Sequence, residues 1–211
     1  MKNIIAKSFT TILIAMVTFL DAQTINRYGT TTANFLEIGI GSRATSMGDA
    51  YVAVANDVSS IYWNPAGLSH VTNSSALFSI QPWLVDIDMM FAGGAFVVPS
   101  VGVIGLGITH LDYGEMDVTN LEYQDGTGER FGASDVAATF TFSRKIVSWF
   151  SFGSSMKYIS SKIWHSSASA FAVDLGVLVN TNFFSFTGKD KDGMNIGCLL
   201  YTSPSPRDRY I

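Results

Sequence analysis

Large apolar side chains alternate with small or polar ones along several stretches of the chain. The pattern is clearest in residues 101–113, 134–143, 149–160 and 169–179. In the first of these, Ile104, Leu106 and Ile108 share one face, and Gly105 and Gly107 lie on the other. A period of two residues is typical of β-strands, so we expect an all-β protein. The period alone fits both a membrane barrel and a soluble sandwich.

Strand length, aromatic positions and connection lengths favour a transmembrane antiparallel β-barrel. Six strands are expected, at residues 75–82, 84–98, 101–112, 134–145, 149–162 and 167–180. Several are long enough for a tilted membrane crossing, and the ends of strands carry Trp83, Tyr113, Trp149 and Trp164, as in an interfacial girdle. The turns at 99–100 and 145–148 are short, whereas 114–133 is long and acidic, which predicts periplasmic turns at one end and external loops at the other.

Composition agrees with a barrel that crosses a membrane with strands. Hydrophobic residues make up 47% of the chain and charged residues only 14%, with a mean hydropathy of +0.26. Residues 91–108 carry no charge, but Pro99 and several glycines argue for two strands around a turn and against one spanning helix.

Six strands cannot close a membrane barrel, since the smallest such barrels have eight. We therefore expect residues 74–197 to be part of an incomplete barrel. Residues 198–211 are predicted to be a non-native tail, because CLLYTSPSPRD breaks the alternation and resembles translated sequencing-adapter DNA. The alternative is a native disordered tail, given its Ser and Pro content.

The first 22 residues have the layout of a cleaved secretory signal peptide. Lys2 and Lys7 precede an uncharged stretch from residue 8 to 20, and Ala22 provides a small residue at the cleavage point. The alternative is a single anchoring helix, but the apolar stretch is short for a membrane span. The mature chain is expected to begin near Gln23 and to be exported from the cytoplasm.

Residues 34–69 form a compact segment rich in small residues, which favours a short helix packed closely against other backbone. Asn64 and Pro65 suit the cap and first position of a second short helix. The segment resembles the N-terminal signature of the PorV/PorQ family of outer-membrane proteins, whose wider relatives are the FadL-like transporters. The matching residues are Gly41, Arg43, Met47, Gly48, Ala50, Tyr51, Asp57 and the string Tyr62-Trp63-Asn64-Pro65-Ala66-Gly67-Leu68.

The resemblance implies that residues 23–73 form a hatch, or plug, inside the barrel. It also implies a place in the bacterial outer membrane, with membrane lipid, secretion-machinery proteins and secreted cargo as partners. The expected role is that of an accessory of type IX protein secretion that binds the C-terminal signal domains of cargo. The alternative is a FadL-like channel for small hydrophobic compounds. In such a hatch Arg43 needs an acidic partner, such as Asp57, because an unpaired internal charge is costly.

No arrangement of residues predicts an enzyme, a metal site or a cofactor site. Residues 39–44 fit a dinucleotide-binding pattern formally, but no βαβ unit surrounds them, so close glycine packing explains them better. The three histidines are far apart in the sequence, and Asp86 and Asp88 have no other catalytic group near them. The single cysteine lies in the predicted tail. A net charge of −4 without a basic cluster argues against nucleic acid as a partner.

Overall fold

The computed structural model describes residues 33–84, 87–124, 126–181 and 193–201. The predicted signal peptide, residues 23–32 of the predicted hatch and the end of the predicted tail lie outside this part of the chain. Seven strands form one antiparallel sheet in which each strand pairs with the next along the chain. They are β1 (Ser75–Pro82), β2 (Asp88–Val98), β3 (Gly102–Asp117), β4 (Arg130–Val147), β5 (Phe150–Ile163), β6 (Ser166–Thr181) and β7 (Met194–Tyr201).

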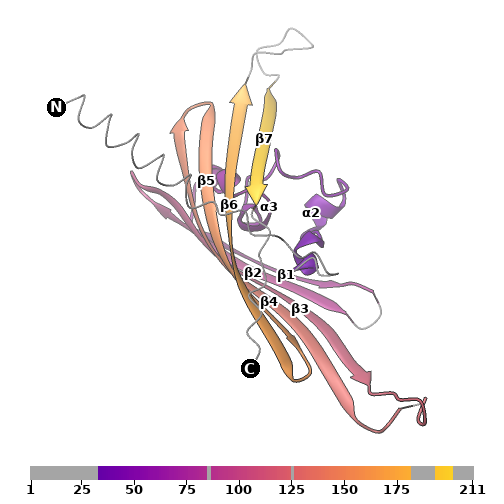
Figure 1. Ribbon diagram of the computed structural model, residues 1–211. Coiled ribbons are helices and arrows are strands. Elements are labelled where there is room, and N and C mark those ends of the chain that lie inside the picture. The colour runs from indigo at the N-terminus through magenta and orange to yellow at the C-terminus, as the bar shows by residue number, and fades with distance from the viewer. Residues whose placement is uncertain (1–32, 85–86, 125, 182–192, 202–211) are drawn as a thin grey trace, which may run out of the picture. The chain divides into compact units, whose positions relative to one another are not determined.

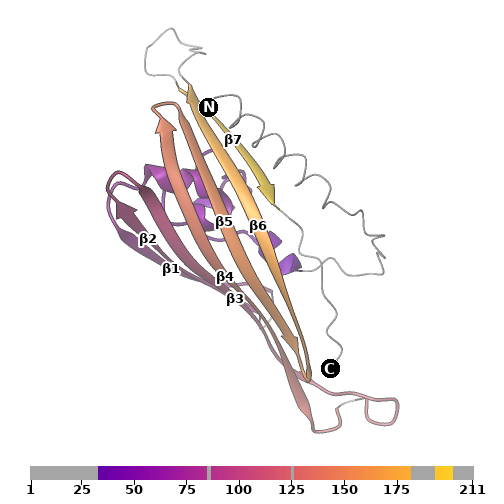
Figure 2. The same ribbon diagram turned by 60° about the vertical axis from the view of Figure 1, so that its left-hand side comes forward.

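The sheet is twisted and curled into a half-barrel (Figures 1 and 2). The all-β antiparallel fold confirms the expectation from the sequence, but the expected number of six strands is one too low. β7 continues through the predicted tail boundary at residue 198, with Cys198 opposite Val177 and Leu199 opposite Gly176. An edge strand is held by backbone hydrogen bonds, which do not require alternating side chains. For that reason periodicity missed it.

Three expected strand boundaries are also corrected. The strand expected from residue 84 begins at Asp88, and before it the Trp83 N–H donates a hydrogen bond to the Ile87 carbonyl. β3 and β4 continue into the predicted loop 114–133, so the connection is only residues 118–129. The guanidinium of Arg130 joins these extensions by pairing with Glu115 and Asp117.

The two faces of the sheet have the predicted alternation in full. Side chains on the outer face are large, apolar and exposed, with Leu106 at 51%, Ile108 at 55% and Phe171 at 71%. Side chains on the inner face are buried, and they include small or polar residues such as Thr141 and Ser143, at 0%, beside larger apolar ones such as Leu111. A soluble sheet protein differs, because the face it exposes is polar.

Three of the four predicted girdle aromatics lie at strand ends, and the fourth does not. Trp83, Trp149 and Trp164 lie in the connections and are about half exposed. Tyr113 lies within β3, where it packs against the core and donates a hydrogen bond of 2.7 Å to Asp135. The prediction failed there because β3 runs further than its alternation indicated.

The two short turns named in the prediction share one end of the sheet and the long connection lies at the other, but a further short turn breaks the contrast. In an antiparallel meander successive connections lie at alternate ends of the sheet. Turns 99–101 and 148–149 therefore share one end of the sheet, while the two-residue turn 164–165 shares the other end with 118–129. Connection length does not distinguish the two ends.

Residues 33–73, called the hatch segment below, cover the inner face of the sheet. Their helices are η1 (Asn34–Glu37), α2 (Ser42–Thr45), α3 (Ser60–Trp63) and η2 (Pro65–His70). The expected helix over the small residues is limited to one turn, because Gly48 and Asp49 adopt positive φ angles of 61° and 64°. None of the helices in the described ranges is long and apolar enough to cross a membrane.

The main apolar core lies between the hatch segment and the sheet. The hatch segment contributes buried side chains such as Phe35, Ile61 and Leu68, and the strands contribute Phe91 and Leu111. Glycines in β3 make this contact possible, since a Cβ at Gly105 would lie 2.7 Å from Leu68 Cδ2. The hatch segment is thus packed as a second layer inside the curl of the sheet (Figure 2).

Candidate functional site

Asn64 is the residue that joins the hatch segment to the sheet most directly. Its carboxamide oxygen accepts a hydrogen bond of 3.1 Å from the Ala66 N–H, which caps η2, and Pro65 occupies the first turn. Its amide group donates to the carbonyls of Val52, at 2.8 Å, and Val177 in β6, at 3.4 Å. The predicted capping role is confirmed. The bond to β6 depends on residues 113 apart, which local sequence patterns cannot reveal.

The wall beneath Asn64 and Pro65 is a row of small residues, Ser143, Gly153 and Gly176, which lie opposite one another on β4, β5 and β6. A Cβ at Gly153 would lie 2.3 Å from the carbonyl carbon of Pro65, and one at Gly176 would lie 2.2 Å from Asn64 Oδ1. Ser143 donates a hydrogen bond of 3.2 Å to the Ala66 carbonyl. We call this row the hatch seat.

Gly67 completes the Asn64–Gly67 turn from the other side. Its position for a Cβ is only 2.2 Å from the Ala55 carbonyl oxygen, so no larger residue fits without a backbone shift. Ala66 and Gly67 are both buried. The Asn-Pro-Ala-Gly string therefore has a physical explanation. A cap, a fixed φ angle and two small residues are needed where the chain passes between the hatch segment and the wall.

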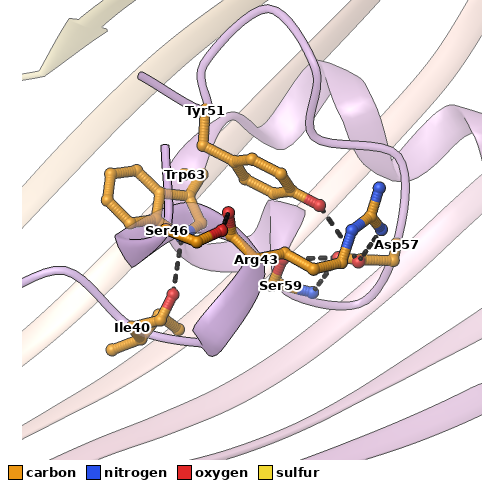
Figure 3. A network of polar contacts seen from close by, with 7 residues as sticks. All are labelled: Ile40, Arg43, Ser46, Tyr51, Asp57, Ser59 and Trp63. Atoms are coloured by element: carbon orange, nitrogen blue, oxygen red, sulfur yellow. Dashed lines mark hydrogen bonds and ion pairs between the residues drawn. The ribbon is translucent and has the colours of Figure 1, made fainter. Parts of the chain in front are cut away.

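Arg43 and Asp57 form the expected ion pair, with 3.0 Å between a guanidinium nitrogen and Asp57 Oδ2 (Figure 3). The pair is not internal, as the sequence argument assumed, since the two side chains are 61% and 39% exposed. Asp57 does more than pair with Arg43. It accepts a hydrogen bond of 3.2 Å from the Tyr51 hydroxyl and bonds from both the backbone N–H and the hydroxyl of Ser59. Asp57 thereby fixes the turn that precedes α3.

Two aromatic side chains of α3 hold the first part of the hatch segment. The Trp63 indole donates a hydrogen bond of 3.1 Å to the Ile40 carbonyl (Figure 3). The Tyr62 hydroxyl lies 2.7 Å from each of the carbonyls of Leu36 and Ile38. Burial raises the pKa of Tyr62 well above its usual value, and burial followed by the charge of Asp57 raises that of Tyr51. These hydrogen bonds join residues 23 to 26 positions apart, which local sequence patterns cannot reveal.

The remaining signature residues have backbone roles or lie at the surface. Gly41 precedes α2 with a φ of 82°, and Gly48 ends the first turn of helix with a φ of 61°, both of which favour glycine. Met47 is 42% exposed and has no packing role in the core. Gly39 lies against the Asp49 carboxylate, so the expected close packing is confirmed for this glycine, whereas Gly41 has open space and is explained by its φ angle.

The inner face also carries a buried ion pair that the sequence analysis did not identify. Lys157 of β5 and Asp174 of β6 lie 2.6 Å apart, with exposed fractions of 12% and 5%. The alternation in residues 169–179 is enough to place Asp174 on the inner face, but its partner is found only from the register of β5 against β6. In that register Lys157 faces Ala172, and Asp174 lies two pairs along, opposite Ser155.

Across the described ranges, no group of three or more His, Cys, Asp or Glu side chains is placed to hold a metal ion. Asp88 begins β2, whereas Asp86 lies outside the description. The contacts of the hatch segment hold backbone and fix its position on the wall. They do not bring together an acid, a base and a nucleophile.

Comparison with known proteins gives no assignment. No family model matches this sequence, and no curated protein matches it either.

Proposed function

We propose that this chain belongs to an outer-membrane β-barrel of the PorV/PorQ type, in which the hatch segment plugs the lumen. The observation that carries the proposal is the exposed apolar outer face of the sheet. A protein in water gains nothing from exposing Leu106, Ile108, Phe140 and Phe171 side by side, whereas lipid favours such a face. In lipid the backbone groups of the edge strands β1 and β7 also need partners, so the proposal includes further strands that complete the barrel.

The dimensions of β5 support a membrane crossing. This strand has 14 residues and runs between Trp149 and Trp164. At ~3.4 Å per residue it is about 45 Å long. Tilted by ~40°, it would rise about 35 Å, which is enough for an apolar band of ~25 Å with an aromatic residue near each boundary.

Within this class, the described residues favour a secretion accessory over a channel. The hatch seat is in backbone contact with the hatch segment, and the inner wall beside it is lined by serine, threonine and an ion pair. A path for apolar compounds would need an apolar lining. We therefore propose that the protein acts as an accessory of type IX secretion that binds the C-terminal signal domain of cargo, without enzymatic activity.

The connection 118–129 is the proposed contact with cargo. Asn120 orders it by accepting hydrogen bonds from the N–H groups of Glu122 and Tyr123. The loop exposes Leu121 at 95% and Tyr123 at 60%. Apolar and aromatic side chains held on an ordered loop are typical of protein-binding surfaces.

Two leucine substitutions test the membrane proposal and the cargo proposal separately. Leu106→Arg places a charge on the outer face, where arginine costs about 2–4 kcal/mol at the middle of a bilayer. We expect it to reduce stable insertion into lipid vesicles. Leu121→Arg makes the same change in the loop, so insertion should be normal while binding of a purified cargo signal domain is lost.

The outcomes distinguish the alternatives. Equal insertion of the Leu106→Arg variant and the unmodified protein would contradict a lipid-facing sheet. Normal insertion with no cargo binding by the unmodified protein, combined with uptake of a fluorescent fatty acid into the vesicles, would favour the FadL-like channel instead. The matched loop variant shows that a new arginine does not by itself prevent insertion.

A further inference from the structure

The Lys157–Asp174 pair lies on the inner wall, directly under α3. The other ion pairs between described residues, those of Arg43 and Arg130, are exposed, whereas both members of this pair are almost fully covered. Lys157 Nζ lies 6.0 Å from the centre of the Tyr62 ring, within the range of a cation–π contact. Tyr62 is in turn fixed to the first part of the hatch segment through its hydroxyl.

The surroundings of the pair are poorly suited to solvating charge. Ala172 and Ile159 belong to the apolar core, and Tyr62 packs against that core from the hatch segment. Opposite Lys157 on β4 lies Thr139, which is also buried. The pair therefore loses hydration free energy when the hatch segment is seated, and it is hydrated again when the hatch segment leaves.

Buried ion pairs often contribute less stability than apolar side chains of the same volume, because their mutual attraction does not fully offset the loss of hydration. Removal of only one partner is different, because it leaves an uncompensated charge. Compared with apolar side chains at the same place, such a pair under the hatch segment lowers the free energy needed to lift that segment. The hatch seat around Gly153 has the opposite effect, since its contacts exist only when the segment is seated.

We propose that Lys157 and Asp174 form a release device for the hatch segment. The pair keeps the contact beneath α3 weak enough to open, while Asn64 and the hatch seat hold the segment in register. This inference rests on the contact between the hatch segment and the wall, and it does not depend on the identity of the cargo.

The test is the double variant Lys157→Met/Asp174→Leu, compared with each single variant by hydrogen exchange of the amides of Tyr62, Trp63 and Asn64. The double variant replaces the pair by apolar groups, so exchange in α3 should be at least tenfold slower than in the unmodified protein. Asp174→Leu alone leaves a buried cation and should make exchange at least tenfold faster. Lys162→Met, at the exposed end of the same strand, is the matched control and should change nothing.

Amides in the middle of β4 and β5 report whether each variant has kept its fold. If the double variant does not fold, Lys157→Gln/Asp174→Asn removes both charges with little change in shape and should also slow exchange in α3. Exchange at the original rate, or faster, in a folded variant that lacks both charges would overturn the proposal.

Discussion

Replacement of Gly153 by alanine tests how the hatch segment is seated. The added methyl carbon would lie 2.3 Å from the carbonyl carbon of Pro65, 2.4 Å from the Ala66 nitrogen and 2.6 Å from the Pro65 oxygen. All three are backbone atoms of the turn that Asn64 caps, so a side-chain rotation cannot relieve the contact. Either β5 or the start of η2 has to move.

Overpacking of a well-packed site costs about 1–3 kcal/mol. We expect a value near the upper end, about 3 kcal/mol, because the displaced backbone also loses its bond from Ser143 and its cap. Since 1.4 kcal/mol corresponds to a factor of ten, the ratio of seated to unseated hatch segment should fall about 100-fold. A glycine-to-alanine change at a site without a clash instead stabilises by about 0.4–1 kcal/mol.

Gly94→Ala provides that control, because its methyl carbon would be 3.5 Å from Phe96, an ordinary contact on the outer face. Limited proteolysis of the hatch segment and urea unfolding, followed by tryptophan fluorescence, would measure both variants. We expect rapid cleavage and a lower unfolding midpoint for Gly153→Ala only. If the two variants are equally resistant, the seat does not hold the hatch segment as described.

Other substitutions test the polar contacts of the hatch segment. Asn64→Ala should cost about 1–3 kcal/mol, because it leaves buried backbone groups such as the Ala66 N–H unpaired, and it should loosen the segment without preventing membrane insertion; resistance to proteolysis equal to that of the unmodified protein would contradict this. Arg43→Ala should change the free energy of unfolding by less than ~1 kcal/mol, because the pair is exposed, whereas Asp57→Ala should cost more; urea titration would rank them, and equal losses would contradict the role given to Asp57. The pKa of Tyr62 is raised above the ordinary 10.0 by burial, so its contribution to stability is complete below pH 10 and is lost as the pH rises through the folded value. In alkaline unfolding Tyr62→Phe should lose less stability than the unmodified protein over that pH range, and an identical pH profile would refute the assignment.

Much of the sheet could be predicted from side-chain alternation. β1 has the predicted bounds, and the inner and outer residues of β3 to β6 are as expected, because each strand has one exposed apolar face and one buried face. β7 was missed because backbone pairing at an edge leaves little trace in the sequence. The strand extensions around Arg130 depend on ion pairs between β3 and β4, which become apparent only when the register is known.

Only the site contacts between residues close together in the sequence could be predicted. Asn64 as a cap depends on residues two positions apart, and its prediction was confirmed. Arg43 was matched with the correct acid, but its surroundings were expected to be buried and are exposed. The hatch seat and the Lys157–Asp174 pair each combine residues from different strands. The reason for a glycine in a strand is clear only when the residue packed on it is known. For Gly153 that residue is Pro65, about 90 positions earlier in the chain.

The order of these elements along the chain has a consequence for folding. The hatch segment is synthesised before every strand of its seat, and its bonds from Asn64 to Val177 and from Ser143 to Ala66 span 113 and 77 residues. Contacts of such separation form late, because a long loop must close before they can contribute. Asn64 and the residues beside it therefore stay exposed to solvent until β6 has paired with β5. A chaperone that recognises uncovered apolar segments would have its longest opportunity at residues 61–68, and docking of the hatch segment would follow the pairing of β6.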